Sequence, residues 1–154
     1  MMIGIVGSRR RNFSEDVRTL ERTFVKILAT KLGIYFGDID DLGSSLKDVT
    51  IVTGDCDEGG DFFARYLSII YKCKLDVKRI KDPETGEEMD FKNHRWFPYL
   101  EMVQIFYDRN EEIAKEPLDY LIALVTPYRT GGTENTIKHF KRLHKDWKEK
   151  LIIL

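Results

Sequence analysis

Three glycine-containing segments of the chain have the residue types of a phosphate-binding turn. Residues 130–137 read Thr-Gly-Gly-Thr-Glu-Asn-Thr-Ile, follow the apolar run at residues 118–125 and precede a helical pattern. Glycine lets the backbone approach a ligand closely, and the first N–H groups of a helix have no partner inside the helix. Such groups bind phosphate well. Residues 4–10 and 53–61 are two further segments of this kind, each after an apolar run.

The groups in these turns suggest how an anion would be held. Main-chain N–H groups and threonine hydroxyls of residues 131–136 would bind phosphate, and the guanidinium of Arg9 would clamp it bidentately, whereas Arg10 and Arg11 are expected to be solvated. The alternative for the first turn is a simple capped helix start with Thr133 as N-cap. The expected ligand-binding residues are Gly7, Ser8, Arg9, Gly54, Gly60, Asp61, Arg109, Asn110, Gly131, Gly132, Thr133, Glu134 and Thr136.

Two interpretations are open for several polar and aromatic residues near the turns. Asp61 accepts hydrogen bonds from ribose hydroxyls or caps its own helix. Arg109 is a candidate for a second anion clamp, and Asn110 would orient the loop or bond a base or a ribose hydroxyl. An exposed helix surface or an N-cap is the alternative for both. His94 and Trp96 are candidates to stack on a base, and core packing or simple exposure is the alternative for both. No nucleophile or general base is evident, so the catalytic residues are unknown.

Metal ligands are not expected. The three carboxylates within residues 55–58 are of the kind that holds Mg²⁺, but acids gathered at the start of a helix usually need no metal. The two cysteines, Cys56 and Cys73, lack zinc-ligand spacing and indicate reduced thiols. The identity of any cofactor is therefore unknown from the sequence.

Composition limits the class of protein. The 154 residues suit a single domain spanning residues 1–154, with 42% hydrophobic and 33% charged residues. The formal net charge of −1 argues against a protein that binds nucleic acid over its whole surface. The chain shows neither a leader pattern nor an apolar stretch of about 18 residues, so we expect a cytoplasmic protein with no membrane partner.

The pattern of apolar residues predicts strands that alternate with helices. Nearly continuous apolar runs are typical of buried strands, whereas apolar residues at every third or fourth position indicate a helix with one buried side. The predicted strands cover residues 1–6, 49–52, 75–80, 118–125 and 151–154, with a short extra strand at 33–36. The predicted helices begin near residues 14, 62, 98 and 133, and the third is expected to be interrupted at residues 108–110. Residues 37–45 and 82–93 are predicted loops, the second of them exposed.

This alternation predicts an α/β fold of the Rossmann-like, doubly wound type. Parallel neighbours need right-handed crossover connections, which place helices on both faces of the sheet. We expect a mainly parallel sheet of about five strands in the order 3-2-1-4-5. Ligands bind such sheets beyond the carboxyl ends of the strands, where the winding direction reverses. That point lies between the strands ending at Val6 and Val125, so the turns at Gly7 and Gly131 should face each other.

Three short motifs in one order resemble the SLOG superfamily of Rossmann-like proteins, and most of all its YspA-related branch. That branch carries a segment ending G-A-D, an R-N pair that opens a helix, and a G-T-x-D-T-I-like turn. This chain has Gly-Gly-Asp at residues 59–61, Arg109-Asn110, and Gly-Thr-Glu-Asn-Thr-Ile at residues 132–137. The resemblance spans most of the chain. It implies a homo-oligomeric sensor, carrier or sequestering protein that binds a nucleotide or a nucleotide-derived molecule.

Two alternatives follow from the same resemblance. LOG enzymes of the superfamily split nucleoside 5′-monophosphates and carry a P-G-G-x-G-T-x-E-E turn, but Asn135 and Thr136 stand where that pattern has its glutamates. Asn and Thr cannot act as carboxylates, so cleavage of an N-glycosidic bond, using Glu134 or Asp61, is only the alternative function. The weaker alternative, through the DprA fold, is single-stranded nucleic-acid binding by the arginines at residues 9–11 and the basic C-terminal helix.

Overall fold

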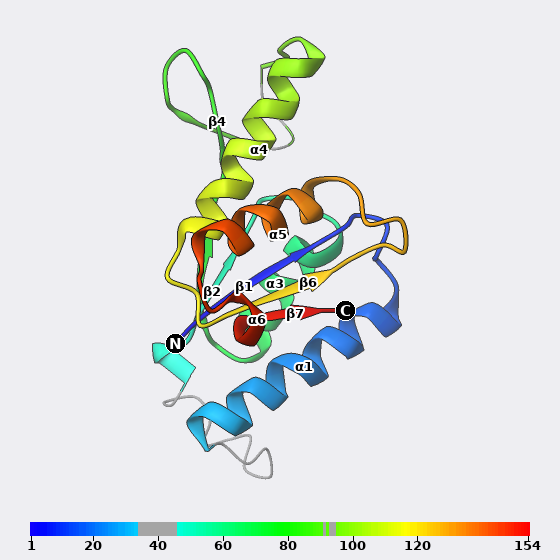
Figure 1. The fold of residues 1–154 in the computed structure, drawn as a ribbon, viewed down its shortest axis with the longest axis vertical. Coiled ribbons are helices and arrows are strands. Elements are labelled where there is room, and N and C mark those ends of the chain that lie inside the picture. The colour runs from blue at the N-terminus through cyan, green and yellow to red at the C-terminus, as the bar shows by residue number, and fades with distance from the viewer. Residues whose placement is uncertain (34–45, 91, 93–94) are drawn as a thin grey trace.

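The computed structural model describes residues 1–33, 46–90, 92 and 95–154, and its centre is a five-stranded parallel sheet (Figure 1). The strands are β1 (Met2–Gly7), β2 (Thr50–Thr53), β3 (Lys74–Val77), β6 (Tyr120–Leu124) and β7 (Leu151–Ile153). They are hydrogen-bonded in the order β3-β2-β1-β6-β7, and every neighbouring pair is parallel. Because β6 and β7 are the fourth and fifth strands of this sheet, the predicted order 3-2-1-4-5 is confirmed.

Helices cover both faces of the sheet, as a doubly wound fold requires. Side chains alternate along β6, so that Ile122 packs in one apolar cluster and Leu121 in the other. The first cluster includes buried residues of α1 (Ser14–Leu32) and α3 (Gly59–Ile70), and the second includes those of α4 (Tyr99–Lys115) and α5 (Gly132–Leu143). The shorter helices are α6 (Trp147–Lys150) and the 3₁₀ helix η2 (Leu46–Asp48).

Glycines at two positions let α3 approach the end of β1. A Cβ atom on Gly60 would lie 2.7 Å from the Cα atom of Gly7, and a Cβ atom on Gly7 would lie 2.9 Å from the Cα atom of Gly60. Real Cβ atoms do not come this close to backbone atoms, so a side chain at either position would push the helix away from the strand. Gly60 therefore sets where the first turn of α3 lies against the turn that follows β1.

An arm projects from the sheet (Figure 1). It consists of the antiparallel hairpin of β4 (Ile80–Lys81) and β5 (Glu88–Met89) together with the first half of α4. We call residues 80–90 and 95–106 the arm. The arm has a small apolar core of its own, in which Ile80, Met102 and Ile105 are buried.

Several predicted boundaries need correction. The third strand of the sheet ends at Val77, because Ile80 leaves the sheet and pairs in the hairpin with Met89. The predicted interruption at residues 108–110 is wrong: α4 runs unbroken to Lys115, since buried side chains such as Asn110 hold this stretch against α5. The predicted strand and loop at residues 33–45 lie outside the described residues, apart from Gly33 at the end of α1. Among the described residues, no helix is long and apolar enough to span a membrane.

Candidate functional site

The turns that follow β1 and β6 border the same cavity, which has a volume of about 740 Å³. Residues 7–9 line it from one turn and residues 130–133 from the other. β1 and β6 are neighbouring strands, so the turns at their carboxyl ends meet where the winding direction reverses. Of the other predicted ligand-binding residues, Asp61, Arg109, Asn110 and Thr136 also line the cavity, whereas Gly54, Gly60 and Glu134 do not.

The turn after β6 has a backbone shape that requires glycine. Gly131 is the N-cap of α5, with φ 88° and ψ −160°, a region that is essentially closed to residues with a Cβ atom. α5 therefore begins at Gly132, and the interpretation of Thr133 as N-cap is wrong, because Thr133 lies buried inside the first turn. The hydroxyl of Thr136 donates to the carbonyl of Gly132 at 3.1 Å. The N–H groups of the first turn are thus the main donors offered to a ligand.

The turn after β1 is held by hydrogen bonds to the end of β6. The N–H group of Ser8 donates to the carbonyl of Leu124 at 3.0 Å. Arg11 was expected to be solvated, but its Nε contacts Asp16 at 2.6 Å and its Nη1 donates to the carbonyl of Val125 at 2.6 Å. Arg11 is therefore a structural residue that joins this turn to α1 and β6. Arg9, in contrast, is exposed and lines the cavity.

Arg109 lies between two buried carboxylates instead of in an open anion site. Its Nη1 atom is 2.8 Å from Oδ1 of Asp55 and 3.5 Å from Oδ2 of Asp61, and the Arg109 side chain is only 10% exposed. Gly54 makes room for this cluster, because a Cβ atom there would lie 2.8 Å from Cζ of Arg109. Gly54 therefore supports the site without lining the cavity.

The two carboxylates differ in how completely they are bonded. Asp61 accepts hydrogen bonds from the N–H group of Cys56 (3.2 Å) and the hydroxyl of Thr53 (3.4 Å), so it neither caps α3 nor stands free for a ribose. Oδ2 of Asp55 is buried and has no hydrogen-bond partner within the described part of the chain. Burial raises the pKa of Asp61 and the pKa of Asp55, and the charge of Arg109 opposes both shifts. The cluster thus holds one more carboxylate than its guanidinium can neutralise.

Replacing Asp55 by asparagine is expected to raise the free energy of unfolding at pH 7 by on the order of 1 kcal/mol. The amide oxygen of the asparagine can still accept a hydrogen bond from Arg109. The one remaining negative charge, on Asp61, then balances the positive charge of the guanidinium. The folded pKa of Asp55 is raised, so the stability contributed by this group is present at low pH and is lost as pH rises from 3.8 through the raised value. In urea denaturation, the advantage of the variant should grow with pH across that window and then stay constant. Equal stability at every pH would contradict the proposed imbalance of charge.

Asn110 connects α4 to the start of α5. Its side chain is almost fully buried, at 2% exposure. The amide Nδ2 donates to the carbonyl of Gly132 (3.2 Å) and to Oδ1 of Asn135 (3.4 Å), and Oδ1 accepts from Nε of Arg109 (3.2 Å). Arg109 and Asn110 therefore occur as a pair because one orients the other, and together they fix the position of the turn after β6.

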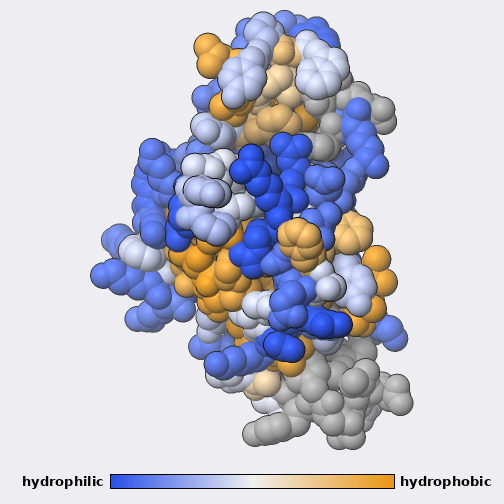
Figure 2. All heavy atoms as spheres, turned by 90° about the vertical axis from the view of Figure 1, so that its right-hand side faces the viewer, coloured by the Kyte–Doolittle hydropathy of each residue, from blue (hydrophilic) through white to orange (hydrophobic). Residues whose placement is uncertain are grey.

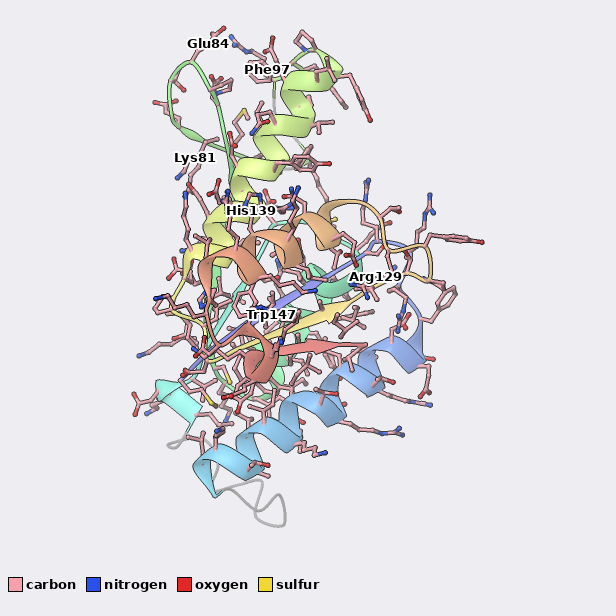
Figure 3. All side chains as sticks on the ribbon, in the orientation of Figure 1. Lys81, Glu84, Phe97, Arg129, His139 and Trp147 are labelled. Carbon is pink, nitrogen blue, oxygen red and sulfur yellow. The ribbon has the colours of Figure 1, made fainter. Side chains whose placement is uncertain are left out.

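The remaining acidic candidates lie away from the cavity or are paired. Glu134 forms an ion pair with Arg129, which Figure 3 shows in the loop before α5, and does not line the cavity. Asp57 contacts Arg65 at 3.4 Å and Lys92 at 2.7 Å. The described residues contain no cluster of three or more His, Cys, Asp or Glu that could hold a metal ion.

One long side of α4 forms the far wall of the cavity, a feature that sequence reasoning missed. Tyr99, Phe106, Asn110 and Ile113 recur at helical spacing and line it together, and Trp96 lines it just before the helix. In Figure 2, side chains of intermediate hydropathy gather over the arm, above a band of strongly hydrophilic side chains. His94, the other candidate for base stacking, falls outside the described residues.

The lining of the cavity is rich in cations. Within the described part of the chain, Arg9, Arg10, Lys92 and Arg109 line it, against the single lining carboxylate of Asp61. The buried carboxylates neutralise Arg109, and Lys92 contacts an aspartate outside the cavity, so Arg9 and Arg10 supply most of the charge that a ligand would meet. Comparison of the chain with protein-family models, with curated proteins and with solved structures gives no match.

Proposed function

We propose that this protein binds a nucleotide or a nucleotide-derived phosphate ligand and acts as a sensor, carrier or sequestering protein. The observation that carries the proposal is the convergence of the turns after β1 and β6 on one cavity. The phosphate lies at the first turn of α5, between Ser8 and Thr133. The sugar and base extend along α4, away from the sheet.

Three features of the site favour the binding of an anion at the first turn of α5. The first N–H groups of α5 point out of the helix without an intrahelical partner, and the helix dipole adds about 0.3–1 kcal/mol for an exposed anion. Arg9 supplies a guanidinium, which binds phosphate through two parallel hydrogen bonds. Gly131 lets a ligand approach the backbone closely. Its φ of 88° favours glycine, and glycine has no side chain to obstruct the approach.

Replacing Arg9 by alanine is expected to weaken the binding of AMP or ADP by on the order of tenfold or more, because a charge-assisted hydrogen bond is lost. Isothermal titration calorimetry with AMP, ADP and inorganic phosphate measures the effect. The matched control is Arg22→Ala, which removes an exposed arginine of α1 that does not line the cavity. The control should bind as the unchanged protein does.

The proposal fails if none of these phosphate compounds binds, or if Arg9→Ala and Arg22→Ala bind them equally well. Product analysis after the same incubations tests the alternative function, because cleavage of the N-glycosidic bond would release free base from AMP. A loss of that release in Asp61→Asn or Glu134→Gln would assign the role to the carboxylate concerned.

A further inference from the structure

α4 provides a distance scale along the cavity. Asn110 lies at the level of the phosphate turn, because its amide donates to the carbonyl of Gly132 at 3.2 Å. Phe106 and Tyr99 line the same cavity further toward the start of the helix. An α-helix rises 1.5 Å per residue, so Phe106 lies about 6 Å and Tyr99 about 16 Å beyond the phosphate level. Side chains on a helix also lean toward its N-terminus, which moves the ring of Tyr99 further away.

A mononucleotide is too short to contact both aromatic positions. About six bonds of about 1.5 Å join its phosphorus to the nitrogen that carries the base, so the base begins no more than about 8 Å from the phosphate. The base itself adds about 5 Å, so with the phosphate at the first turn of α5 it covers the level of Phe106 and ends short of Tyr99. Tyr99 and Trp96 would then have no contact with the ligand.

The far end of the cavity nevertheless has the residue types of a base-binding surface. Tyr99 is 80% exposed and Trp96 is 83% exposed, and both line the cavity. Large exposed aromatic side chains beside each other mark binding surfaces in soluble proteins. Aromatic rings stack on any base through its π-face, whatever the sequence.

From this spacing we propose that the ligand is a dinucleotide that ends in a phosphate group. Its terminal phosphate lies at the turns after β1 and β6, its first base lies at the level of Phe106, and its second base stacks on Tyr99 and Trp96. The inference rests on the proposed function, because the turns bind the terminal phosphate. The same chemical group occurs in a free dinucleotide and at the phosphorylated end of a nucleic-acid strand.

The test compares the affinities of pApA (5′-phosphorylated diadenylate), AMP and ApA, which lacks the terminal phosphate, by isothermal titration calorimetry. The unchanged protein should bind pApA about tenfold to a hundredfold more tightly than AMP, because a second base is stacked, and more tightly than ApA. In Tyr99→Ala the ratio of the pApA and AMP affinities should fall to near one. Tyr66→Ala is the matched control, because Tyr66 is a partly exposed tyrosine of α3 that does not line the cavity; it should keep the full ratio.

Tryptophan fluorescence provides a second readout. Trp147 lies on α6, away from the arm, as Figure 3 shows, so Trp147→Phe leaves Trp96 as the only tryptophan of the chain. In this variant pApA should quench the fluorescence, whereas AMP should leave it nearly unchanged, because only the second base reaches the arm.

The outcomes separate the dinucleotide inference from the proposed function. If AMP binds but pApA binds no more tightly, or if Tyr99→Ala keeps the full ratio, the inference fails and the proposed function stands. If neither compound binds, both fail. A 5′-phosphorylated 20-residue oligoadenylate identifies the source once pApA binds: equal affinity assigns the site to strand ends, and much weaker binding assigns it to a free dinucleotide.

Discussion

Replacing Arg109 by alanine should lower the free energy of unfolding at pH 7 by about 3–5 kcal/mol, because two buried carboxylates lose the guanidinium between them. Asp55 and Asp61 contact the same Nη1 atom, and both lie in the interior. A buried charge without a partner is among the largest single causes of destabilisation in folded proteins. Urea denaturation of the unchanged protein and of Arg109→Ala measures the loss.

The loss in free energy of unfolding caused by Arg109→Ala should depend on pH in a defined direction. Arg109 lowers the pKa of Asp55 and of Asp61, so its removal raises both folded values further above those of the unfolded chain. A carboxyl group with a raised folded pKa contributes stability at low pH that is lost as pH rises through its titration range. The deficit of Arg109→Ala should therefore be smaller at pH 5 than at pH 7.

Two further variants control this result. Arg22→Ala removes an exposed arginine of α1 and should change the free energy of unfolding by less than about 0.5 kcal/mol. Adding Asp55→Asn to Arg109→Ala should restore part of the lost stability, because one of the two uncompensated charges is removed. This expectation would be contradicted if Arg109→Ala lost less than about 1 kcal/mol of the free energy of unfolding and the loss did not vary with pH. Charge pairing would then not stabilise the cluster.

The substitution Gly60→Ala should destabilise the protein by about 3 kcal/mol, or prevent folding, because the new methyl group meets backbone that cannot move aside. Its carbon would lie 2.7 Å from Cα of Gly7, at the point where α3 crosses the end of β1. Gly132→Ala is the control, since among the described residues a Cβ atom there meets only the side-chain amide nitrogen of Asn110, at 3.3 Å. Thermal and urea denaturation compare the two variants. Equal stability of Gly60→Ala and the unchanged protein would contradict the close approach of helix and strand.

The parts of the fold that the sequence predicts are those with a local physical signal. Buried parallel strands are short apolar runs, and β1 and β6 have this pattern, with nearly all of their central residues buried. Alternation of such strands with helices then restricts the sheet to a few right-handed, doubly wound orders. The position of the turns at Gly7 and Gly131 follows from that order. The sequence alone therefore predicts that both turns lie at one end of the sheet.

Contacts between distant segments carry no such signal, and there the sequence misleads. Arginine is the residue type of an anion clamp, but the guanidinium of Arg109 donates to Asp55, which lies 54 residues earlier in the chain. Glu134 stands in a promising motif, but the rotation of α5 directs it to Arg129. Gly60 is part of a family-like motif, but its lack of a side chain serves the packing of α3 on Gly7.

The sequence contains a signal for the wall of the cavity along α4, but the predicted interruption of the helix conflicts with it. Tyr99, Phe106 and Ile113 recur every seven residues, which places them on one side of a helix, and Asn110 falls on the same side. The polar residues at 108–110 predict an interruption of the helix, and an interruption would separate the aromatic residues from Arg109-Asn110. Buried hydrogen bonds of Asn110 keep the helix continuous.

The most direct test of phosphate binding at the two turns is an NMR titration of the ¹⁵N-labelled protein with AMP, following every backbone amide. Binding at these turns predicts that the largest shifts fall on the amides of Ser8, Arg9, Gly132 and Thr133, and that Arg9→Ala needs more AMP to reach the same shifts. The hypothesis would be contradicted if AMP shifted amides elsewhere on the protein while these four stayed in place, or if saturating AMP shifted none.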